Sequence, residues 1–513
     1  MERAVEIAIL LLAPWPLVRL LLARPFHERL AAHPGLLAGV VAGVAGAAGL
    51  VVLLALGPPW PLRVAAGLAV VASLLAWWRA RPGYGVARGL PPGSLALTQL
   101  GLVQDDRFLL RQAERHGPVF KIAHYGRPMA CVVGLRRGAE LLREAGDGLV
   151  SGALPFSRLI PGGFIRYMPP AEHARYRALL VRALPGDMVH AAAPAIDAAA
   201  VRAFGSLAAA GGAGVSPIPG LHALTLEVLV GLLFGIGPDD PRLARMRELY
   251  PALAVPSLAR AGLRRAEAAM AELTVIAATA AAEAQARRAA GATPACALDH
   301  LVAEGPAVLA DPTLTGNLVY MVETGGRDTA GLLAWCLKML ADHPAWRRRL
   351  AEAARGDGAA DLAGRIAAET LRLEQSEYVI RRAARPVRIG EHRIPAGWLV
   401  RICVRESHRD PALFAEPERF DPDRFLERRP GPAEYAPLGM GGHTCLGRSV
   451  VQVTAATALT VLARDFDWRP VADGPRECGA FHWMPSARFA IRVERTPTAA
   501  PVAADGRRVV QPT

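Results

Sequence analysis

An uncharged apolar run close to the N-terminus limits what this chain can fold into more than any other feature. Gly35 to Leu56 contains 22 residues without a charge, which is about 33 Å of α-helix at ~1.5 Å per residue and long enough to cross the hydrocarbon core of a bilayer. The helix-breaking segment Gly57 to Pro61 follows, and a second apolar run extends from Val64 to Trp78. These runs predict two transmembrane helices in an N-terminal membrane anchor.

Arginines on both sides of this pair predict its orientation, because positively charged flanks remain in the cytoplasm. They are Arg24, Arg29, Arg79, Arg81 and Arg88. We therefore expect a multi-pass protein of the cell membrane whose remaining chain lies on the cytoplasmic side. A third apolar stretch, Val5 to Ala23, is interrupted by charges and prolines and could be another span, an interfacial helix or a re-entrant segment. A cleaved signal peptide is the alternative, although the two runs downstream would still hold the chain in the membrane.

The overall composition is that of a folded protein and argues against nucleic-acid binding. Of 513 residues, 52% are hydrophobic and 20% are charged, which excludes a disordered chain. The formal net charge is +13, but no dense basic run is interleaved with aromatic residues, as a nucleic-acid interface would require. The six cysteines lie far apart without metal-binding spacing, which indicates reduced thiols in a cytosolic compartment.

Beyond the anchor the sequence predicts one mostly helical domain. The anchor covers residues 1–80, a Pro- and Gly-rich linker covers 81–92, the domain covers 93–495 and a polar tail covers 496–513. Two strand patterns separated by a Gly-Arg-Pro turn occur at Val119–Ile122 and Ala130–Val133. Helical periodicity occurs in the longer segments Glu172–Leu184, Leu221–Phe234, Ser257–Ala290, Leu314–Ala341 and Ala359–Arg372. We therefore expect a mainly α fold with small β-sheets.

Cys445 lies in a glycine-rich segment that extends from Pro437 to Gly447 and precedes a helical pattern starting at Arg448. Its glycines let the backbone turn tightly and approach a flat ligand, and they leave N–H groups free to donate to a sulfur. A cysteine at a helix start also has its pKa lowered by the helix dipole. The segment alone is equally compatible with a buried structural cysteine in a tight turn.

Four further segments precede this loop in a defined order. They are Glu369-Thr-Leu-Arg372, Arg393 to Val400, His408-Arg-Asp-Pro and Phe420 to Phe425. Glu369 and Arg372 lie three residues apart in a predicted helix and so share a face. The order and spacing of these segments, together with Cys445, resemble the cytochrome P-450 superfamily of haem-thiolate monooxygenases, in a membrane-anchored form of bacterial type. The resemblance extends from about Pro91 to Arg492 and implies the mainly α fold of that family.

The resemblance implies roles for the cysteine loop and for a set of charged residues. The Cys445 thiolate would be the proximal ligand of the iron of haem b, in a haem-binding loop that includes Gly439 and Gly447. The expected contacts to the haem propionates are His443, His173, Arg177 and Arg381, with Arg382 as the alternative to Arg381. A buried ion cluster with a structural role, in which a carboxylate is bonded between two cations, is expected from Glu369, Arg372 and Arg424.

The segment Gly325 to Ala330 lies inside the predicted helix from Leu314. Two adjacent glycines inside a helix reduce its stability by about 1 kcal/mol each relative to alanine. This cost indicates that the glycines have a structural or functional role. In the family a kink at this place opens a groove over the iron for O2, and Asp328 and Thr329 match the acid–alcohol pair that delivers protons for O–O cleavage. Two residues depart from the family pattern. Leu438 replaces the usual Phe beside the sulfur, and the cation Arg327 either points away from the haem or holds an anionic substrate group.

The resemblance also implies partners. No flavin or ferredoxin module fits the chain, so electrons are expected from a separate ferredoxin or flavodoxin-type protein with its reductase, for which an arginine-rich face around Arg448 would suit an acidic donor. Pro251 to Ala259 is uncharged and lies where the family has its access lid. We therefore expect hydroxylation or epoxidation, with O2, of an apolar or amphipathic molecule taken from the bilayer, such as a lipid, terpenoid or polyketide. Desaturation, oxidative coupling, peroxide-driven oxidation and a non-catalytic haem sensor are the alternatives.

Overall fold

The computed structural model describes residues 89–496, apart from residues 94, 96–101, 103, 125–126, 152–155, 211–213, 255–259, 375–378 and 479–482. The predicted membrane runs Val5–Ala23, Gly35–Leu56 and Val64–Trp78, most of the linker, nearly all of the tail and the second half of the expected lid lie outside the described residues. Within the described part of the chain, no helix combines the length and the apolar character that a membrane crossing needs.

The strands gather mainly in one mixed sheet, with the order β1-β2-β7-β4-β3. Its strands are β1 (Val119–His124), β2 (Arg127–Val132), β3 (Leu149–Ser151), β4 (Val379–Ala383) and β7 (Leu399–Ile402). β1 and β2 form the hairpin that the sequence predicted, and β7 pairs parallel to β2. Three two-stranded sheets complete the described strands: β5 (Val387–Ile389) with β6 (His392–Ile394), β8 (Phe466–Ala472) with β11 (Ala490–Arg495), and β9 (Glu477–Cys478) with β10 (Trp483–Met484).

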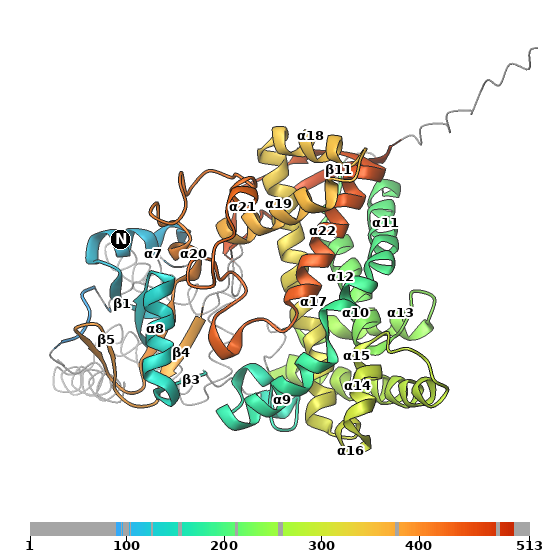
Figure 1. The fold of residues 1–513 in the computed structure, drawn as a ribbon, viewed down its shortest axis with the longest axis horizontal. Coiled ribbons are helices and arrows are strands. Elements are labelled where there is room, and N and C mark those ends of the chain that lie inside the picture. The colour runs from blue at the N-terminus through green and yellow to red at the C-terminus, as the bar shows by residue number, and fades with distance from the viewer. Residues whose placement is uncertain are drawn as a thin grey trace, which may run out of the picture.

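A long central helix, α17, organises the helical part of the molecule (Figure 1). It extends from Pro312 to Asp342, and it begins where the Asp311 carboxylate accepts hydrogen bonds from the N–H groups of Thr313 and Leu314. Proline at the first helical position strengthens that start, because its missing N–H is not needed there. The helices around it are α11 (Ala193–Ala209), α12 (Ile218–Phe234), α19 (Ala359–Leu373) and α22 (Arg448–Asp465), with packing of α12, α19 and α22 against α17.

The remaining helices cover this centre and the sheet. They are α7 (Phe108–His116), α8 (Leu135–Ala145), α9 (Pro170–Ala183), α10 (Gly186–Ala191), α13 (Pro241–Leu249), α14 (Arg260–Ala289), α15 (Ala297–Leu301), α16 (Pro306–Leu309), α18 (Pro344–Ala353), α20 (Val404–Ser407) and α21 (Arg424–Glu427). The five predicted helices are confirmed as α9, α12, α14, α17 and α19. α11 was not predicted, because three of its six buried residues are alanines (Ala199, Ala200 and Ala203) and give only a weak hydrophobic period.

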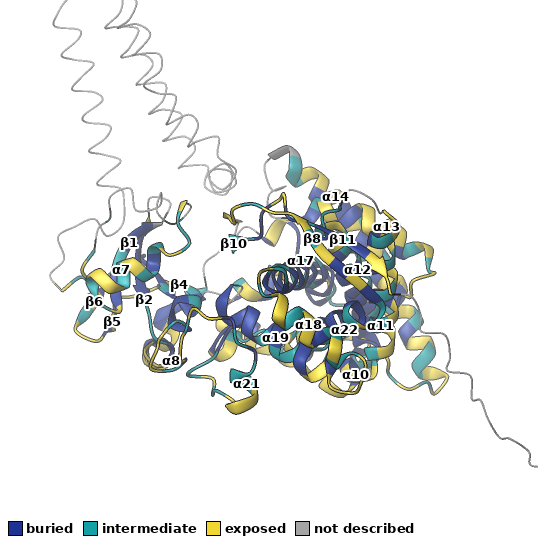
Figure 2. Ribbon diagram, turned by 90° about the horizontal axis from the view of Figure 1, so that it is seen from above, coloured by how far each residue is buried: buried dark blue, intermediate teal, exposed yellow. Residues whose placement is uncertain are grey.

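The mainly helical fold with small sheets is therefore confirmed. Figure 1 shows the larger sheet with α7 and α8 at one end of the molecule and the long helices at the other. Burial concentrates on α17 and on the faces that α12, α19 and α22 turn towards it (Figure 2). The segment that carries Cys445 lies between α21 and α22, where it borders both the sheet end and the helical end.

Candidate functional site

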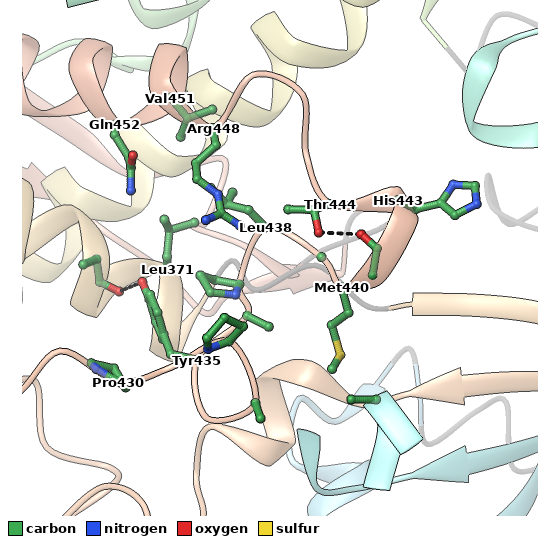
Figure 3. Close-up of a pocket in the computed structure, with 18 of the residues that line it drawn as sticks. Leu371, Pro430, Tyr435, Leu438, Met440, His443, Thr444, Arg448, Val451 and Gln452 are labelled. Atoms are coloured by element: carbon green, nitrogen blue, oxygen red, sulfur yellow. Dashed lines mark hydrogen bonds between the residues drawn. The ribbon is translucent and has the colours of Figure 1, made fainter. Parts of the chain in front are cut away.

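Two neighbouring cavities meet at the cysteine loop, Pro437 to Gly447. The smaller, of about 270 Å³, lies between α17, α9 and residues 156–167, and Cys445 lines it. The larger, of about 1260 Å³, lies between α8, α19, the loop and the first turns of α22 (Figure 3). Residues of the loop line both cavities, so the loop forms a wall between them.

The loop is held in shape by short local hydrogen bonds. The Cys445 N–H donates to the Leu438 carbonyl at 2.8 Å, and the Thr444 hydroxyl donates to the Gly441 carbonyl at 2.8 Å (Figure 3). Gly439 adopts a φ of +88°, and a Cβ there would lie 3.3 Å from the His443 carbonyl oxygen. A side chain at this position would therefore be strained. Cys445 is half-buried and stands three residues before α22, so its sulfur lies near the positive end of a helix dipole.

The structure brings the three predicted cluster residues together. Glu369 and Arg372 are fully buried, and the Arg372 guanidinium donates to both carboxylate oxygens of Glu369 at 2.7 and 2.8 Å. Arg424 Nε donates to Glu369 Oε1 at 2.9 Å, as does the backbone N–H of Asp421. The carboxylate is therefore bonded from three directions, which offsets its removal from water.

Arg372 extends this cluster to the chain that leads to Cys445. Its guanidinium also donates to the backbone carbonyls of His408, Pro417 and Arg419, at 2.9, 2.7 and 3.2 Å. One buried side chain thus fixes three points of the segment between β7 and α21. Sequence reasoning predicted the cluster but not these carbonyl contacts, because nothing in the sequence indicates which backbone atoms approach a guanidinium.

His408 connects the cluster to the cysteine loop, a role that sequence reasoning missed. Its Nε2 accepts the N–H of Ala436 at 3.1 Å, while its carbonyl is held by Arg372. Burial lowers the pKa of His408 to about 3, so the imidazole remains neutral and keeps its acceptor nitrogen. Next to Ala436, the Tyr435 hydroxyl donates to the Ala368 carbonyl of α19 at 2.7 Å (Figure 3).

The two histidines and two arginines that were expected to contact the propionates also meet at this site. His443 points away from the other labelled side chains of the larger cavity (Figure 3), and its ring stacks on His173 of α9 at a centroid distance of 4.0 Å. Burial is the main cause that lowers the pKa of His173, and the nearby charges of Arg177 and Arg381 lower it further. Burial also lowers the pKa of His443 to about 3, and the surrounding groups Arg381, His173, Arg166 and Arg177 contribute to this shift. Arg381 lines the larger cavity while Arg382 is exposed, which favours Arg381.

The predicted oxygen-site residues line the smaller cavity together with Cys445. Asp328 and Thr329 belong to α17, and Thr329 is buried. α17 continues across Gly325 and Gly326, so the adjacent glycines do not interrupt the helix. They face α12: the Thr225 hydroxyl donates to the Gly326 carbonyl at 3.0 Å, and a Cβ on Gly325 would meet Leu229 at 3.4 Å, an ordinary contact distance.

The two residues that depart from the family pattern, Leu438 and Arg327, both line the smaller cavity. Leu438 lines both cavities, so an apolar side chain covers the loop next to the cysteine. Arg327 lines the smaller cavity and forms an ion pair with Glu323, one helical turn earlier on α17. The charge of Arg327 is therefore balanced within its own helix.

Asn317 holds the wall of the smaller cavity opposite the cysteine loop, and sequence reasoning missed it. Its side-chain oxygen accepts the Ile165 N–H at 2.7 Å, and its amide group donates to the carbonyls of Gly163 and Thr313 at 3.1 and 2.8 Å. Asn317 is fully buried. It thereby ties residues 163–165 to α17, and two of them, Phe164 and Ile165, line the cavity.

These residues fit a haem bound through Cys445. A sulfur at a helix start suits an iron ligand, and the cations that depress the pKa of His173 and His443 suit two propionate carboxylates. Burial lowers the pKa of Arg177 while the nearby Cys445 sulfur opposes that shift, which places the sulfur close to the cations. Among the described residues, no group of three His, Cys, Asp or Glu side chains converges to hold a metal ion without such a cofactor.

Comparison with known proteins agrees with this geometry. The family model for cytochrome P-450 matches residues 264–484. A Mycobacterium tuberculosis protein whose name places it among the cytochromes P-450 is 29% identical over 77% of this chain and 86% of its own length. Abscisic acid 8'-hydroxylase 3 of Oryza sativa is 27% identical over 76% of this chain and 84% of its own length. The solved structure of the retinoic acid-bound cyanobacterial protein CYP120A1 superposes with a TM-score of 0.62, at 21% identity, over 80% of this chain and all of that chain.

The fold, the cysteine loop with its buried ion cluster and these matches lead to one conclusion. The chain is similar to cytochromes P-450 in sequence and in fold, and these matches support a haem-binding monooxygenase of the oxidoreductase class.

Proposed function

We propose that this protein is a membrane-tethered monooxygenase that inserts one atom of O2 into an apolar or amphipathic organic substrate. The other oxygen atom leaves as water, with two electrons from a separate donor protein and two protons. The observation that carries this proposal is that one cavity is lined both by Cys445 and by the acid–alcohol pair Asp328 and Thr329.

The proposed binding roles follow from the contacts of each residue. Haem held by a thiolate supplies the redox chemistry that activates O2. Cys445 would be its ligand, on a loop whose geometry is fixed by Gly439 and by the hydrogen bond between the Cys445 N–H and Leu438. The propionates would be bound by the cations Arg177 and Arg381 and by the imidazoles of His173 and His443, which gather beside that loop.

We assign proton delivery to the neighbouring side chains on α17. The Thr329 hydroxyl is buried in the cavity wall, where it would donate its proton at Oγ1 to the reacting oxygen. Asp328 directly precedes Thr329 in the sequence, and its carboxyl group would return a proton to Oγ1. Leu229 of α12 and Leu332 of α17 line the same cavity and would exclude water that competes with this transfer.

A separate, acidic electron donor is the proposed redox partner. Arg448 begins α22 directly after the cysteine loop and lines the larger cavity. Arg143 and Arg365 line that cavity as well. A ferredoxin or flavodoxin-type protein has the opposite charge, which would orient it towards the cysteine side of the haem.

The proposed substrate is largely apolar and is taken up from a membrane. The smaller cavity is lined by many apolar side chains, including Phe156, Phe164, Leu233 and Met321. Two relatives carry names that mention abscisic acid and retinoic acid, compounds with an apolar body and one carboxylate. The apolar runs at Gly35–Leu56 and Val64–Trp78 support a multi-pass anchor in the cell membrane with the catalytic domain on the cytoplasmic side.

The absorption spectrum of the reduced protein with carbon monoxide tests the central assignment. Wild-type protein is expected to give the long-wavelength band of a thiolate-ligated haem, and Cys445→Ser to lose that band while Cys478→Ser keeps it. A second reaction with ¹⁸O-labelled O2, a reconstituted donor and lipid extracts should yield a product that carries one labelled oxygen. A thiolate band that persists in Cys445→Ser would overturn the ligand assignment.

A further inference from the structure

Tyr320 carries a buried hydroxyl that no part of the proposed mechanism uses. It lies on α17 with 1% of its surface exposed, and among the residues that the structure describes its hydroxyl has no hydrogen-bond partner. An unpaired buried hydroxyl costs about 1–3 kcal/mol, so buried polar groups are nearly always paired. For a residue that lines a cavity, a bound ligand would supply the missing partner.

The position of Tyr320 shows where such a partner would lie. Tyr320 lines the same cavity as Cys445 and Thr329. Nine residues separate it from Thr329 along α17, which is about 13 Å of helix rise. The backbone positions of the two residues are therefore separated along the helix, although both residues line one cavity.

The rings around Tyr320 suit a flat apolar molecule. Phe156 and Phe164 meet the Tyr320 ring edge-on, with centroid distances of 4.9 and 5.0 Å. Phe156 also stacks on Tyr167 at 5.5 Å. Aromatic clusters of this kind bind flat or unsaturated groups through dispersion and ring contacts. Asn317 fixes the loop that carries Phe164 and Tyr167 to α17, so this wall is formed before a ligand arrives.

The charges near Tyr320 leave its hydroxyl as a donor. Burial raises the pKa of Tyr320. The nearby Arg327 lowers this pKa, whereas Tyr167 and Asp328 raise it. The net effect is a raised pKa, so the phenol keeps its proton. Arg327 is already paired with Glu323. The phenol is thus the donor in this part of the cavity that still needs an acceptor.

We propose that Tyr320 donates a hydrogen bond to an oxygen acceptor on the substrate, at a group other than the carbon that is oxidised. The substrate class is an amphipathic molecule with a flat or unsaturated apolar body and a carbonyl or carboxylate oxygen at its far end. This inference rests on the proposed function, because it takes the oxidised carbon to lie beside Thr329.

Imidazole derivatives test the inference without turnover, because their free ring nitrogen binds haem iron and shifts its absorption spectrum. We would compare three series of increasing chain length: ω-(imidazol-1-yl)alkanoic acids, their methyl esters and 1-alkylimidazoles without an acceptor. In wild-type protein, one chain length should give the acceptor-bearing compounds an affinity about tenfold higher than that of the 1-alkylimidazole of the same length. At shorter and longer chain lengths this preference should be smaller. The esters separate a requirement for an acceptor from a requirement for negative charge.

Tyr320→Phe keeps the ring and removes the donor. It should abolish the tenfold preference at the optimal length and leave the affinity of the 1-alkylimidazoles unchanged. Because the unpaired hydroxyl is gone, the free energy of unfolding of the ligand-free protein should not decrease. Tyr250→Phe is the matched control, since Tyr250 is also a buried phenol without a partner among the described residues but does not line the cavity.

Two outcomes would overturn the inference. One is a wild-type protein that shows no preference for an acceptor at any length, and the other is a preference that persists in Tyr320→Phe. Unsubstituted imidazole separates this result from a failure of the proposed function. If imidazole gives no spectral shift, the haem assignment fails; if it does, the failure concerns Tyr320 alone.

Discussion

The two sides of the active site are held by different kinds of interaction. On the cysteine side, formed by α19 and residues 408–447, a fully buried carboxylate and guanidinium pair with each other, and Arg372 reaches three backbone carbonyls. On the helix side, formed by α17 and residues 156–167, packed aromatic rings predominate and Asn317 supplies the polar anchor. That side retains a buried hydroxyl, Tyr320, without a protein partner. On the cysteine side, the buried charges are paired within the protein and hold the backbone in place. On the helix side, the Tyr320 hydroxyl remains available to a ligand.

The largest effect is expected from removing the central charge of the cysteine side. Glu369→Gln keeps the shape of the side chain but leaves Arg372 and Arg424 without their counter-charge. Breaking a buried ion pair in this way costs about 3–5 kcal/mol. Urea unfolding should report a loss of this size, accompanied by poor retention of haem.

Glu248→Gln is the control for this substitution. Glu248 forms an exposed ion pair with Arg245, also three residues apart, and its loss should cost less than about 1 kcal/mol. Equal losses in the two variants would contradict a special role for the buried cluster.

The next effect concerns the pH dependence that His408 gives to the cysteine side. Its pKa is about 3 in the folded protein, against about 6.5 in an unfolded chain. Between these values the unfolded chain binds a proton that the folded chain does not, so stability falls as pH decreases below 6.5. At about 1.4 kcal/mol per pH unit, this group alone should remove about 2–3 kcal/mol between pH 7.5 and 4.5.

His408→Gln tests this slope, because its side-chain oxygen can accept the Ala436 N–H without titrating. The free energy of unfolding of this variant should depend less on pH than that of wild-type protein. The difference in slope should correspond to at most one proton bound on unfolding. His408→Leu removes the acceptor as well and should be less stable at every pH. Identical pH slopes for wild type and His408→Gln would show that His408 does not sense pH.

A smaller effect on free energy is expected from Thr329 on the helix side. Thr329→Ala should retain haem and fold, but product formed per electron should fall at least tenfold, about 1.4 kcal/mol, while hydrogen peroxide rises. Thr324→Ala is the control, since Thr324 lines the same cavity and its hydroxyl donates within α17 to the Tyr320 carbonyl. Unchanged coupling in Thr329→Ala would remove it from proton delivery.

The smallest effects are expected from matched glycine substitutions on the two sides. Gly439→Ala should destabilise by about 1–2 kcal/mol, because alanine disfavours positive φ and its Cβ would approach the His443 carbonyl. Gly326→Ala should stabilise by up to about 1 kcal/mol, since its Cβ would meet Leu229 and Thr225 at ordinary contact distances of 3.6 Å. Urea unfolding measures both, and a destabilised Gly326→Ala would mean that α12 needs the space.

Long periodic helices and residue spacing allowed much of this protein to be predicted. α17 and α19 were recognised because their apolar residues recur with helical spacing, and the pair Glu369 and Arg372 because helical geometry places residues three apart on one face. The order of strands in the sheet was not predicted, since β2 pairs with β7 across more than two hundred residues and pairing of that kind leaves no local pattern. The roles of His408, Asn317 and Tyr320 were missed for the same reason, because their partners are distant backbone atoms or are absent from the described part of the chain.

The sequence by itself determined which chemistry is possible: a cysteine among glycines before a helix, an acid and an alcohol in another helix, and the charges of a buried cluster. These are properties of residue type and short spacing, which covalent geometry and helical periodicity carry directly. The tertiary structure alone decided that Cys445, Asp328 and Thr329 line one cavity and that His408 reaches Ala436. Such contacts depend on how whole elements pack, and packing is the collective result of many side chains rather than of any one segment.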